Sequence, residues 1–267
     1  INWNEKSENI SQIVKSLDLR FEDCIFIDDN IVEINKVKNQ IKKINVLHAK
    51  YIKKTIQDIS KDDRFKKLII SKDDAKKFNQ YKLRSKFTRY VENEKIEPHL
   101  IKSLKQKIKI FKCKNSNLRR TEELFNKTNQ FNFSLNRYKN NELLSLNKKD
   151  NFEIKLFNLK DKFGDHGIIG AYIIKKEAKK ILVDDFILSC RVLSRFVEKY
   201  ILCKLQEKYR NKKLEIKYKK TKLNSNLIPK FLEENKLKLL RKRENMYYYH
   251  INFRKDKLNE TKKIFTS

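Results

Sequence analysis

Two adjacent acids, Asp28 and Asp29, follow the short apolar run "CIFI" and are the first residues that could carry chemistry. Neighbouring carboxylates repel each other unless a cation lies between them, and Mg²⁺ is the usual solution. A simpler role is also open, because Asp and Asn commonly cap the N-terminus of a helix. Lys6, ahead of a helical pattern, could act as a point charge beside a phosphate, although one lysine among 65 basic residues is not distinctive.

A second candidate site is the stretch "DDFILSCRVLSRFVEKYI", residues 184–201, where a strand pattern gives way to a helix pattern. The N–H groups at a helix N-terminus form a ready site for an anion, and Arg191 and Arg195 beside them would strengthen binding of a pyrophosphate. The same arginines could instead pair with the acids at 184, 185 or 198. Cys190 could be a nucleophile with a lowered pKa at this junction, or a packed thiol.

The chain has only three glycines, Gly164, Gly167 and Gly170, and all lie within seven positions. The sequence "GDHG" predicts a tight hairpin turn, since glycine accepts positive φ without steric cost. Gly170 would then lie inside the next strand, where glycine marks a bulge, a packing contact or a ligand that passes over the backbone. His166 in the turn could be a base or simply face solvent.

The stretch "NKTNQFNFSLNRY", residues 126–138, is dense in amide, hydroxyl and basic side chains. This composition suits recognition of a polar ligand, or a capped helix end followed by a turn. The four cysteines, scattered without a CxxC pair, indicate neither a zinc site nor a disulfide framework. Reduced thiols of this kind fit a cytoplasmic protein.

The elements that must position these residues are visible in the apolar spacing. In the first part, residues 8–17 and 31–41 read as helices, and residues 24–30 and 44–48 as strands. This strand–helix–strand order predicts a parallel, Rossmann-like sheet with acids at its carboxyl edge. Residues 71–92 and 97–106 also read as helices.

The pattern changes after residue 106 to strands with hairpin turns and interspersed helices. Strands are predicted at 107–111, 152–159, 167–174, 180–188, 214–218 and 247–253. Helices are predicted at 118–131, 194–209 and 227–236, the last with Pro229 in its first turn. The expected fold class is therefore α/β in the first part and mixed α/β in the second.

The formal net charge is +31 at pH 7. A nucleic-acid-binding surface would explain it, but so would a low-GC genome, because Lys, Asn and Ile share A/T-rich codons. Lysines are spread over the whole chain, and surfaces that bind nucleic-acid phosphates usually favour Arg, so a nucleic-acid partner is not expected. The sequence has no run of 18 apolar residues, so no membrane-spanning helix is predicted. The chain starts at Ile1 and its one methionine is Met246, so a fragment is expected.

Taken together, several segments resemble the FkbH-like (HAD subfamily IIIC) family. "INWNEKSENI" and "LDLRFEDCIFIDDN" resemble the end of its haloacid-dehalogenase-like (HAD) domain. "RRTEELFNKTNQFNFSLNRY", "DKFGDHGIIGAYI", "DDFILSCRVLSRFVE" and "KYKKTKLNSNLIPKFLEENKL" resemble its acetyltransferase-like (GNAT) domain, in the same order. The domains implied are residues 1–92 as the C-terminal portion of a HAD-like domain, 93–106 as a connecting helix and 107–267 as a GNAT-like domain.

The resemblance also implies roles. In the HAD portion, Lys6 would neutralise a phosphate or aspartyl intermediate, and Asp28 and Asp29 would hold Mg²⁺. That activity loads a glyceryl-type acyl unit, from a phosphorylated three-carbon donor, onto an acyl carrier protein thiol with release of phosphate. The family's Asp-x-Asp nucleophile motif is absent from this chain, so no phosphatase activity is expected.

In the GNAT portion, the resemblance implies a CoA or phosphopantetheine thioester site. Arg191, Ser194 and Arg195 would bind the phosphates, Gly170 would lie beside a splayed acyl-thioester groove, and Asn224 and Asn226 fall where an asparagine is often kept. The family's glycine-rich loop is replaced here by "RVLSR". The alternative functions are an N-acyltransferase for a sugar amine in surface-polysaccharide biosynthesis and a basic nucleic-acid-binding protein.

Overall fold

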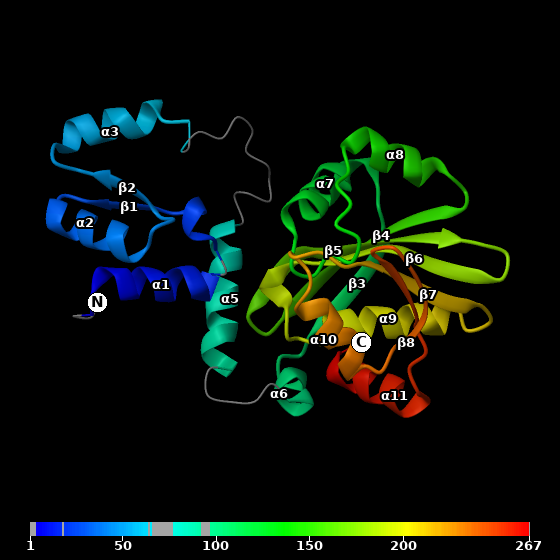
Figure 1. Ribbon diagram of the computed structural model, residues 1–267. Coiled ribbons are helices and arrows are strands. Elements are labelled where there is room, and N and C mark those ends of the chain that lie inside the picture. The colour runs from blue at the N-terminus through cyan, green and yellow to red at the C-terminus, as the bar shows by residue number, and fades with distance from the viewer. Residues whose placement is uncertain (1–3, 18, 64, 66–76, 92–96, 267) are drawn as a thin grey trace. The chain divides into compact units, whose positions relative to one another are not determined.

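The computed structural model describes residues 4–17, 19–63, 65, 77–91 and 97–266 (Figure 1). The chain divides into two compact units, residues 1–90 and 91–267. The helix predicted over 71–92 is described from residue 77 to 91, and the start of the predicted connecting segment, 93–96, lies outside the described residues.

The first unit contains two parallel strands and flanking helices. β1 (Ile25–Asp28) pairs with β2 (Asn45–His48), from Ile25↔Asn45 to Asp28↔His48. The helices are α1 (Lys6–Leu17), α2 (Ile31–Gln40), α3 (Ile52–Lys61) and α5 (Lys77–Val91), the last ending at the boundary. The predicted parallel pair is therefore confirmed within the described residues.

Helix α2 shows why the chain turns directly after the two acids. The side chain of Asn30 accepts a hydrogen bond from the N–H of Val32 at 2.9 Å and so caps the helix. Ile34 and Val37 lie one helical turn apart and are both buried. The cap is Asn30, so Asp28 and Asp29 remain at the end of β1.

The second unit is built on a seven-stranded sheet with the order β3-β4-β5-β6-β7-β9-β8. Its strands are β3 (Lys107–Lys112), β4 (Phe152–Asp161), β5 (Gly164–Lys176), β6 (Lys180–Leu188), β7 (Lys213–Lys219), β8 (Lys238–Arg243) and β9 (Met246–His250). Its helices are α6 (Pro98–Lys102), α7 (Leu118–Lys127), α8 (Asn140–Lys148), α9 (Val197–Lys208), α10 (Leu227–Glu234) and α11 (Lys255–Ile264).

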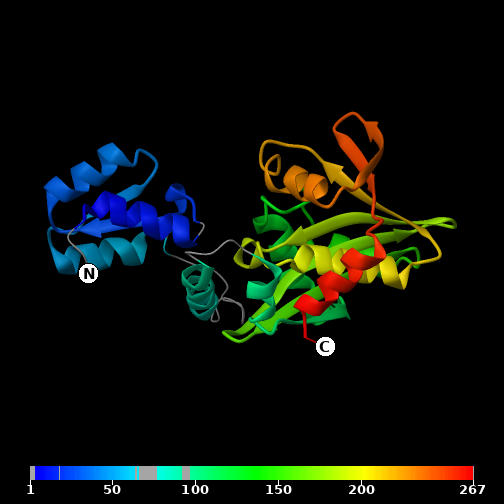
Figure 2. The same ribbon diagram turned by 90° about the horizontal axis from the view of Figure 1, so that it is seen from below.

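Helices cover both faces of this sheet (Figures 1 and 2). α7 and α8 lie over β4 and β5 on one face, and α9 and α11 pack together on the other. The core under α7 and α8 includes Leu124, Phe125, Leu143, Leu156 and Ile187. The interior strand β5 is buried on both faces from Ile169 to Ile174, which explains its continuous apolar sequence.

The hairpin turn lies three residues before the position that the glycines predicted. β4 and β5 are joined by Lys162 and Phe163, and "GDHG" is already part of β5. The carboxylate of Asp161 closes the turn, because it accepts hydrogen bonds from the N–H groups of Phe163 and Gly164 at 2.8 and 3.1 Å. Gly167, with φ 66°, lies in an irregular part of the β4–β5 ladder.

The sheet opens between β6 and β7. These two strands are parallel and pair over four residues only, from Lys180↔Lys213 to Val183↔Ile216, whereas the other neighbouring strands are antiparallel. An extra residue, Asp184, interrupts the pairing of β6 with β5 at the point where the opening begins. A loop and helix α9 follow β6, so the opening and the helix N-terminus are close in sequence.

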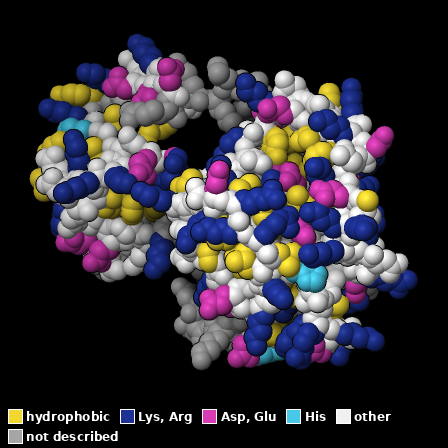
Figure 3. Space-filling view, turned by 45° about the vertical axis from the view of Figure 1, so that its right-hand side comes forward, with side chains coloured by type: hydrophobic (Ala, Val, Ile, Leu, Met, Phe, Trp, Pro, Cys, Tyr) yellow, Lys and Arg dark blue, Asp and Glu magenta, His cyan; other side chains and the backbone are white. Residues whose placement is uncertain are grey.

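The visible face in Figure 3 carries Lys and Arg side chains scattered among acidic and apolar ones. On that face the described residues form no separate basic stripe of the kind that follows a nucleic-acid backbone. None of the described helices is both long and apolar enough to cross a bilayer.

Candidate active site

In the first unit, Lys6 and Asp28 form an ion pair. The ammonium of Lys6 lies 2.5 Å from Oδ2 of Asp28, whose Oδ1 accepts the N–H of Asn30 at 2.9 Å. Burial opposes ionisation, yet these two donors hold the pKa of Asp28 below its usual value. Asp29 is exposed, and its backbone carbonyl contacts Nε2 of His48 at 2.9 Å.

These residues do not fit a magnesium site. The described residues contain no group of three or more His, Cys, Asp or Glu side chains that could hold a metal ion. Both carboxylate oxygens of Asp28 already have donors, and the Lys6 ammonium occupies the position beside Oδ2 that a cation would need. The structure thus brings Lys6 to Asp28, but Asp28 and Asp29 alone do not form the predicted Mg²⁺ site.

In the second unit, a segment from elsewhere in the chain fills the start of the β6–β7 opening. We call residues 130–134 the inserted segment. Its Phe133 N–H donates to the carbonyl of Phe186 at 3.0 Å, and Leu188 N–H donates to the carbonyl of Phe131 at 2.9 Å. Its Phe133 carbonyl accepts the N–H of Lys219 on β7 at 2.7 Å. The inserted segment therefore bridges β6 and β7 as a short extra strand.

The side chains of the inserted segment belong to the core. Phe131 and Phe133 are buried and meet Phe186 and Phe231 edge-to-face, with ring centroids 5.6 to 6.5 Å apart. Asn224, predicted to bind a cofactor, instead holds this segment. Its buried Nδ2 donates to the carbonyls of Asn132 and Lys219, both at 2.9 Å.

Gly170 does not border an open groove. A Cβ at this position would lie 2.3 Å from the Phe157 ring and 2.6 Å from the carbonyl of Ile187. The glycine is needed because Phe157 and the β6 backbone approach it, so the predicted ligand contact is replaced by core packing.

Arg195 also differs from the prediction. Its guanidinium is fully buried and lies 2.5 Å from the carboxylate of Asp161, which His166 contacts at 2.9 Å. Burial would raise the pKa of Asp161, but His166 and Arg195 together hold it below its usual value. Arg195 therefore ties the start of α9 to the β4–β5 hairpin and does not face a pyrophosphate, and His166 is a buried residue of the same cluster.

The loop before α9 has an unusual backbone at two residues that are not glycine. Ser194 and Phe196 have φ values of 63° and 59°, in the left-handed region. Ser194 is exposed, and Phe196 is the N-cap residue of α9 without a side-chain cap. Left-handed residues beside a helix N-terminus turn successive N–H groups toward one point, which is an anion-binding arrangement.

Cys190 and Arg191 lie in the same loop, in a short 3₁₀ turn that spans Cys190–Val192. Both are partly exposed. The Nε of Arg191 donates to Oγ of Ser189 at 3.1 Å. Both residues are thus near the left-handed positions in sequence, whereas Arg195 is withdrawn into the core.

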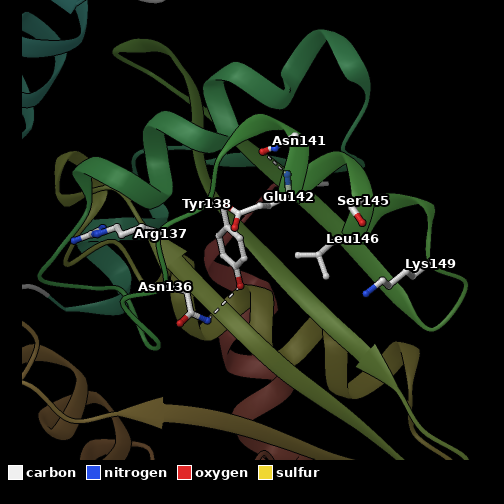
Figure 4. A pocket seen from close by; sticks show the side chains of 8 residues that line it. All are labelled: Asn136, Arg137, Tyr138, Asn141, Glu142, Ser145, Leu146 and Lys149. Atoms are coloured by element: carbon white, nitrogen blue, oxygen red, sulfur yellow. Dashed lines mark hydrogen bonds between the residues drawn. The ribbon is translucent and has the colours of Figure 1, made fainter.

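A pocket of about 580 Å³ lies between α8 and the segment that follows the inserted one (Figure 4). Its lining comprises Asn136, Arg137, Tyr138, Asn141, Glu142, Ser145, Leu146 and Lys149. The hydroxyl of Tyr138 points toward Asn136, while Arg137 extends away from the other side chains (Figure 4). Amide, hydroxyl and charged groups dominate the lining, so the pocket suits a polar molecule.

Beneath this pocket lies Asp185, the residue that follows the bulge in β6. Its side chain has no exposed surface and accepts a hydrogen bond from the Tyr138 hydroxyl. Nδ2 of Asn136 lies 3.3 Å from each of its two carboxylate oxygens. Lys217 is nearby but pairs with Asp184 at 2.5 Å. Burial raises the pKa of Asp185 to about 7, although Tyr138 and Lys217 act in the lowering direction.

The sequence reasoning named Asp185 only as a partner for an arginine and Tyr138 only within the polar stretch 126–138. The available signal was an acid inside an apolar run, "LVDDFIL", because a buried carboxylate is rare without a dedicated partner. The partner Tyr138 lies 47 residues away, so no local pattern joins the two.

No protein-family model matches the chain, and no curated protein matches it. Solved structures do match part of it. A domain from Methanocaldococcus jannaschii is 17% identical with a TM-score of 0.42, over 55% of this chain and 99% of that one. FdhC, a nucleotide-linked sugar GNAT, is 13% identical with a TM-score of 0.43, and the match covers 60% of this chain and 94% of FdhC. The PaiA N-acetyltransferase of Thermoplasma acidophilum, in complex with coenzyme A, is 14% identical with a TM-score of 0.39, and the match covers 54% of this chain and 98% of PaiA. None of these matches supports the predicted HAD-like portion.

Proposed function

We propose that residues 91–267 form a GNAT-type acyltransferase domain that moves an acyl group from a pantetheine-type thioester to an amine. One observation carries the proposal. The parallel strands β6 and β7 separate after four paired residues, and β6 leads into α9 through a loop with left-handed residues at 194 and 196. The resemblance in sequence associates this arrangement with a thioester donor.

The donor end of the proposed site is the loop before α9. The N–H groups of the loop before α9 would bind the phosphates of CoA or of phosphopantetheine. The N–H of Glu198, in the first turn of α9, bonds to the carboxylate of the same residue. The left-handed backbone at Ser194 and Phe196 supports this role, because it is formed without glycine and at the expense of local strain. Arg195 contributes indirectly, by fixing the loop to Asp161.

The acceptor end of the proposed site is the polar pocket beside Tyr138. Its volume of about 580 Å³ suits a sugar-sized molecule, and Asn136, Asn141 and Ser145 offer hydrogen bonds to hydroxyl groups. An amino sugar is therefore the acceptor class that we propose. This agrees with the alternative expected from the sequence, an N-acyltransferase for a sugar amine.

Binding and turnover test the proposal separately. Isothermal titration of the chain with coenzyme A should give one site, and acetyl-CoA with a panel of amino sugars should give an acylated product of the expected mass. Spermidine, an amine without ring hydroxyls, is the matched control acceptor and should react more slowly. Absence of coenzyme A binding together with absence of any acylated product would disprove the proposal.

Loading of an acyl carrier protein is the second candidate. The ion pair between Lys6 and Asp28 favours it, because the sequence resemblance assigns both residues to one phosphate site. It requires a phosphorylated three-carbon donor, a carrier thiol and a nucleophile other than the Asp-x-Asp motif, which this chain lacks, and it predicts an increase in carrier mass on incubation. An unchanged carrier mass beside a successful amine acylation would separate the two candidates.

A further inference from the structure

We propose that Tyr138 takes a proton from the acceptor amine and passes its own proton to Asp185, so that the two residues connect the pocket to a buried base. The inference rests on the proposed function and names the group that deprotonates the acceptor. Tyr138 lines the pocket, whereas Asp185 has no exposed surface.

The Tyr138 hydroxyl is the link between the pocket and the carboxylate. It donates a hydrogen bond to Oδ2 of Asp185 and lies 3.2 Å from Nδ2 of Asn136. The ring is fixed edge-to-face against Phe125, with centroids 4.9 Å apart. A substrate in the pocket can therefore touch Tyr138, whose hydroxyl can pass a proton to Asp185. Asn136 also joins the pocket to this carboxylate, but its amide donates hydrogen bonds and does not relay protons. In this scheme Tyr138 is the catalytic residue and Asp185 is a positioning and proton-accepting residue.

The surroundings of Asp185 leave its carboxylate able to accept a proton. The groups that face it are Tyr138 and Asn136 from the segment before α8, Lys217 from β7, and Asp184 from its own strand. Lys217 is engaged with Asp184, so among the described residues no Lys or Arg is bonded directly to Asp185. The pKa of about 7 is the range in which a general base is most effective at neutral pH.

Each proton that leaves one group in this scheme is taken up by another. The amine nitrogen attacks the thioester carbonyl carbon, the carbon–sulfur bond breaks, and the sulfur leaves as a thiolate. The nitrogen loses a proton to the oxygen of Tyr138 while the proton of Tyr138 moves to Asp185. Asp185 later returns a proton through the same hydroxyl, and the thiolate is protonated. Burial raises the pKa of Tyr138, so its hydroxyl transfers both protons without resting as a phenolate.

The test compares two isosteric variants. Tyr138→Phe removes the hydroxyl and should lower kcat about 10²–10³-fold, with the KM for the amine within about threefold of wild type. Tyr209→Phe is the matched control, because Tyr209 also donates to a carboxylate, that of Glu153 at 3.3 Å, but lies outside the pocket beside Tyr138. It should leave kcat unchanged. Equal kcat values for wild type and Tyr138→Phe would overturn the inference.

Asp185→Asn supplies an independent readout. The wild-type kcat should rise with pH through an apparent pKa near 7, and this rise should disappear in Asp185→Asn. Because this variant replaces a buried group, carboxyl-carbon NMR of the wild type gives a second measurement that needs no substrate. It should show Asp185 titrating near pH 7, and titration near pH 4 would overturn the inference. If coenzyme A binds and amines are acylated with no effect of Tyr138→Phe, only the inference fails; if neither binding nor acylation occurs, the proposed function fails with it.

Discussion

Arg195 and Asp161 form an ion pair at 2.5 Å, and neither side chain has any exposed surface. The pair joins the loop that begins α9 to the end of β4, 34 residues away in sequence. His166 shares the same carboxylate. The arginine of the predicted anion site is thus a structural residue, and its partners are the acid and the histidine of the glycine-containing hairpin.

Arg195→Met should destabilise the second unit strongly. Removing one partner of a buried pair leaves Asp161 as an uncompensated charge, which typically costs about 3–5 kcal/mol of unfolding free energy. Urea unfolding followed by circular dichroism measures the change. Arg254→Met, which breaks an exposed pair with Asp256, is the control and should leave the urea midpoint in place. Similar midpoints for both variants would show that the buried pair contributes little.

Gly170→Ala should destabilise through overpacking. The added Cβ would lie 2.3 Å from the Phe157 ring and 2.6 Å from the Ile187 carbonyl, so both the ring and strand β6 must shift. Such insertions cost about 1–3 kcal/mol. Thermal unfolding measures the effect, and Phe157→Leu in the same chain should recover part of the loss. A melting temperature equal to that of wild type would mean that a ligand groove, and not packing, explains the glycine.

Substitutions of Ser194 test whether the loop binds coenzyme A through its backbone conformation or through the serine side chain. Ser194→Gly preserves φ 63° without strain and should bind coenzyme A as the wild type does. Ser194→Val places a β-branched residue in the left-handed region, where L-residues lose about 1–2 kcal/mol, and should weaken binding about tenfold. Isothermal titration measures both. Equal affinities for the two variants would place the phosphates elsewhere.

The pH dependence of stability should reveal Asp185. Its folded pKa of about 7 is above the ordinary value of 3.8, so between about pH 4 and 7 the native protein retains a proton that the unfolded chain has lost. Unfolding free energy should therefore fall as pH rises through this window, by on the order of 2 kcal/mol between pH 5 and 7. Asp185→Asn should lack this fall.

Glu198 titrates in the same direction, since burial raises its pKa to about 7, so the contribution of Asp185 is read from the difference between wild type and Asp185→Asn at each pH. Urea unfolding at several pH values gives that difference. A difference independent of pH would show that Asp185 is ionised at its ordinary pKa in the folded protein.

The elements with strong apolar patterns were predictable from the sequence. β4, β5, β6 and α9 all occur near their predicted positions, because their buried residues form runs or helical stripes. The missed elements were α3, α8, β8 and α11. In α3, Ile52, Ile56 and Ile59 recur at helical spacing, so the helix had a signal in the sequence that the prediction did not use, although Ile52 and Ile56 are exposed and Thr55 is its buried residue. The edge strand β8 has no fully buried residue and alternates weakly.

The site was less predictable than the fold. The left-handed backbone at Ser194 and Phe196 has no local signal, because glycine, the residue that usually marks it, is absent. The roles of Arg195, Asn224 and Asp185 depend on partners between 34 and 92 residues away. Residues so far apart meet only because the folded sheet brings them together, so the spacing of residues along the chain does not predict these contacts.

The inserted segment also sets conditions on how the second unit acquires its structure. The amide of Asn224 meets the carbonyl of Asn132 across 92 residues of chain, and both edges of the gap in the sheet depend on that earlier stretch for bonds. Contacts of such long range are closed late and slow the search for the native state. In a nascent chain, residues 130–134 would therefore pair with β6 first and gain their second neighbour only when β7 emerges. A piece beginning at β4 would carry two strand edges with no neighbour between them.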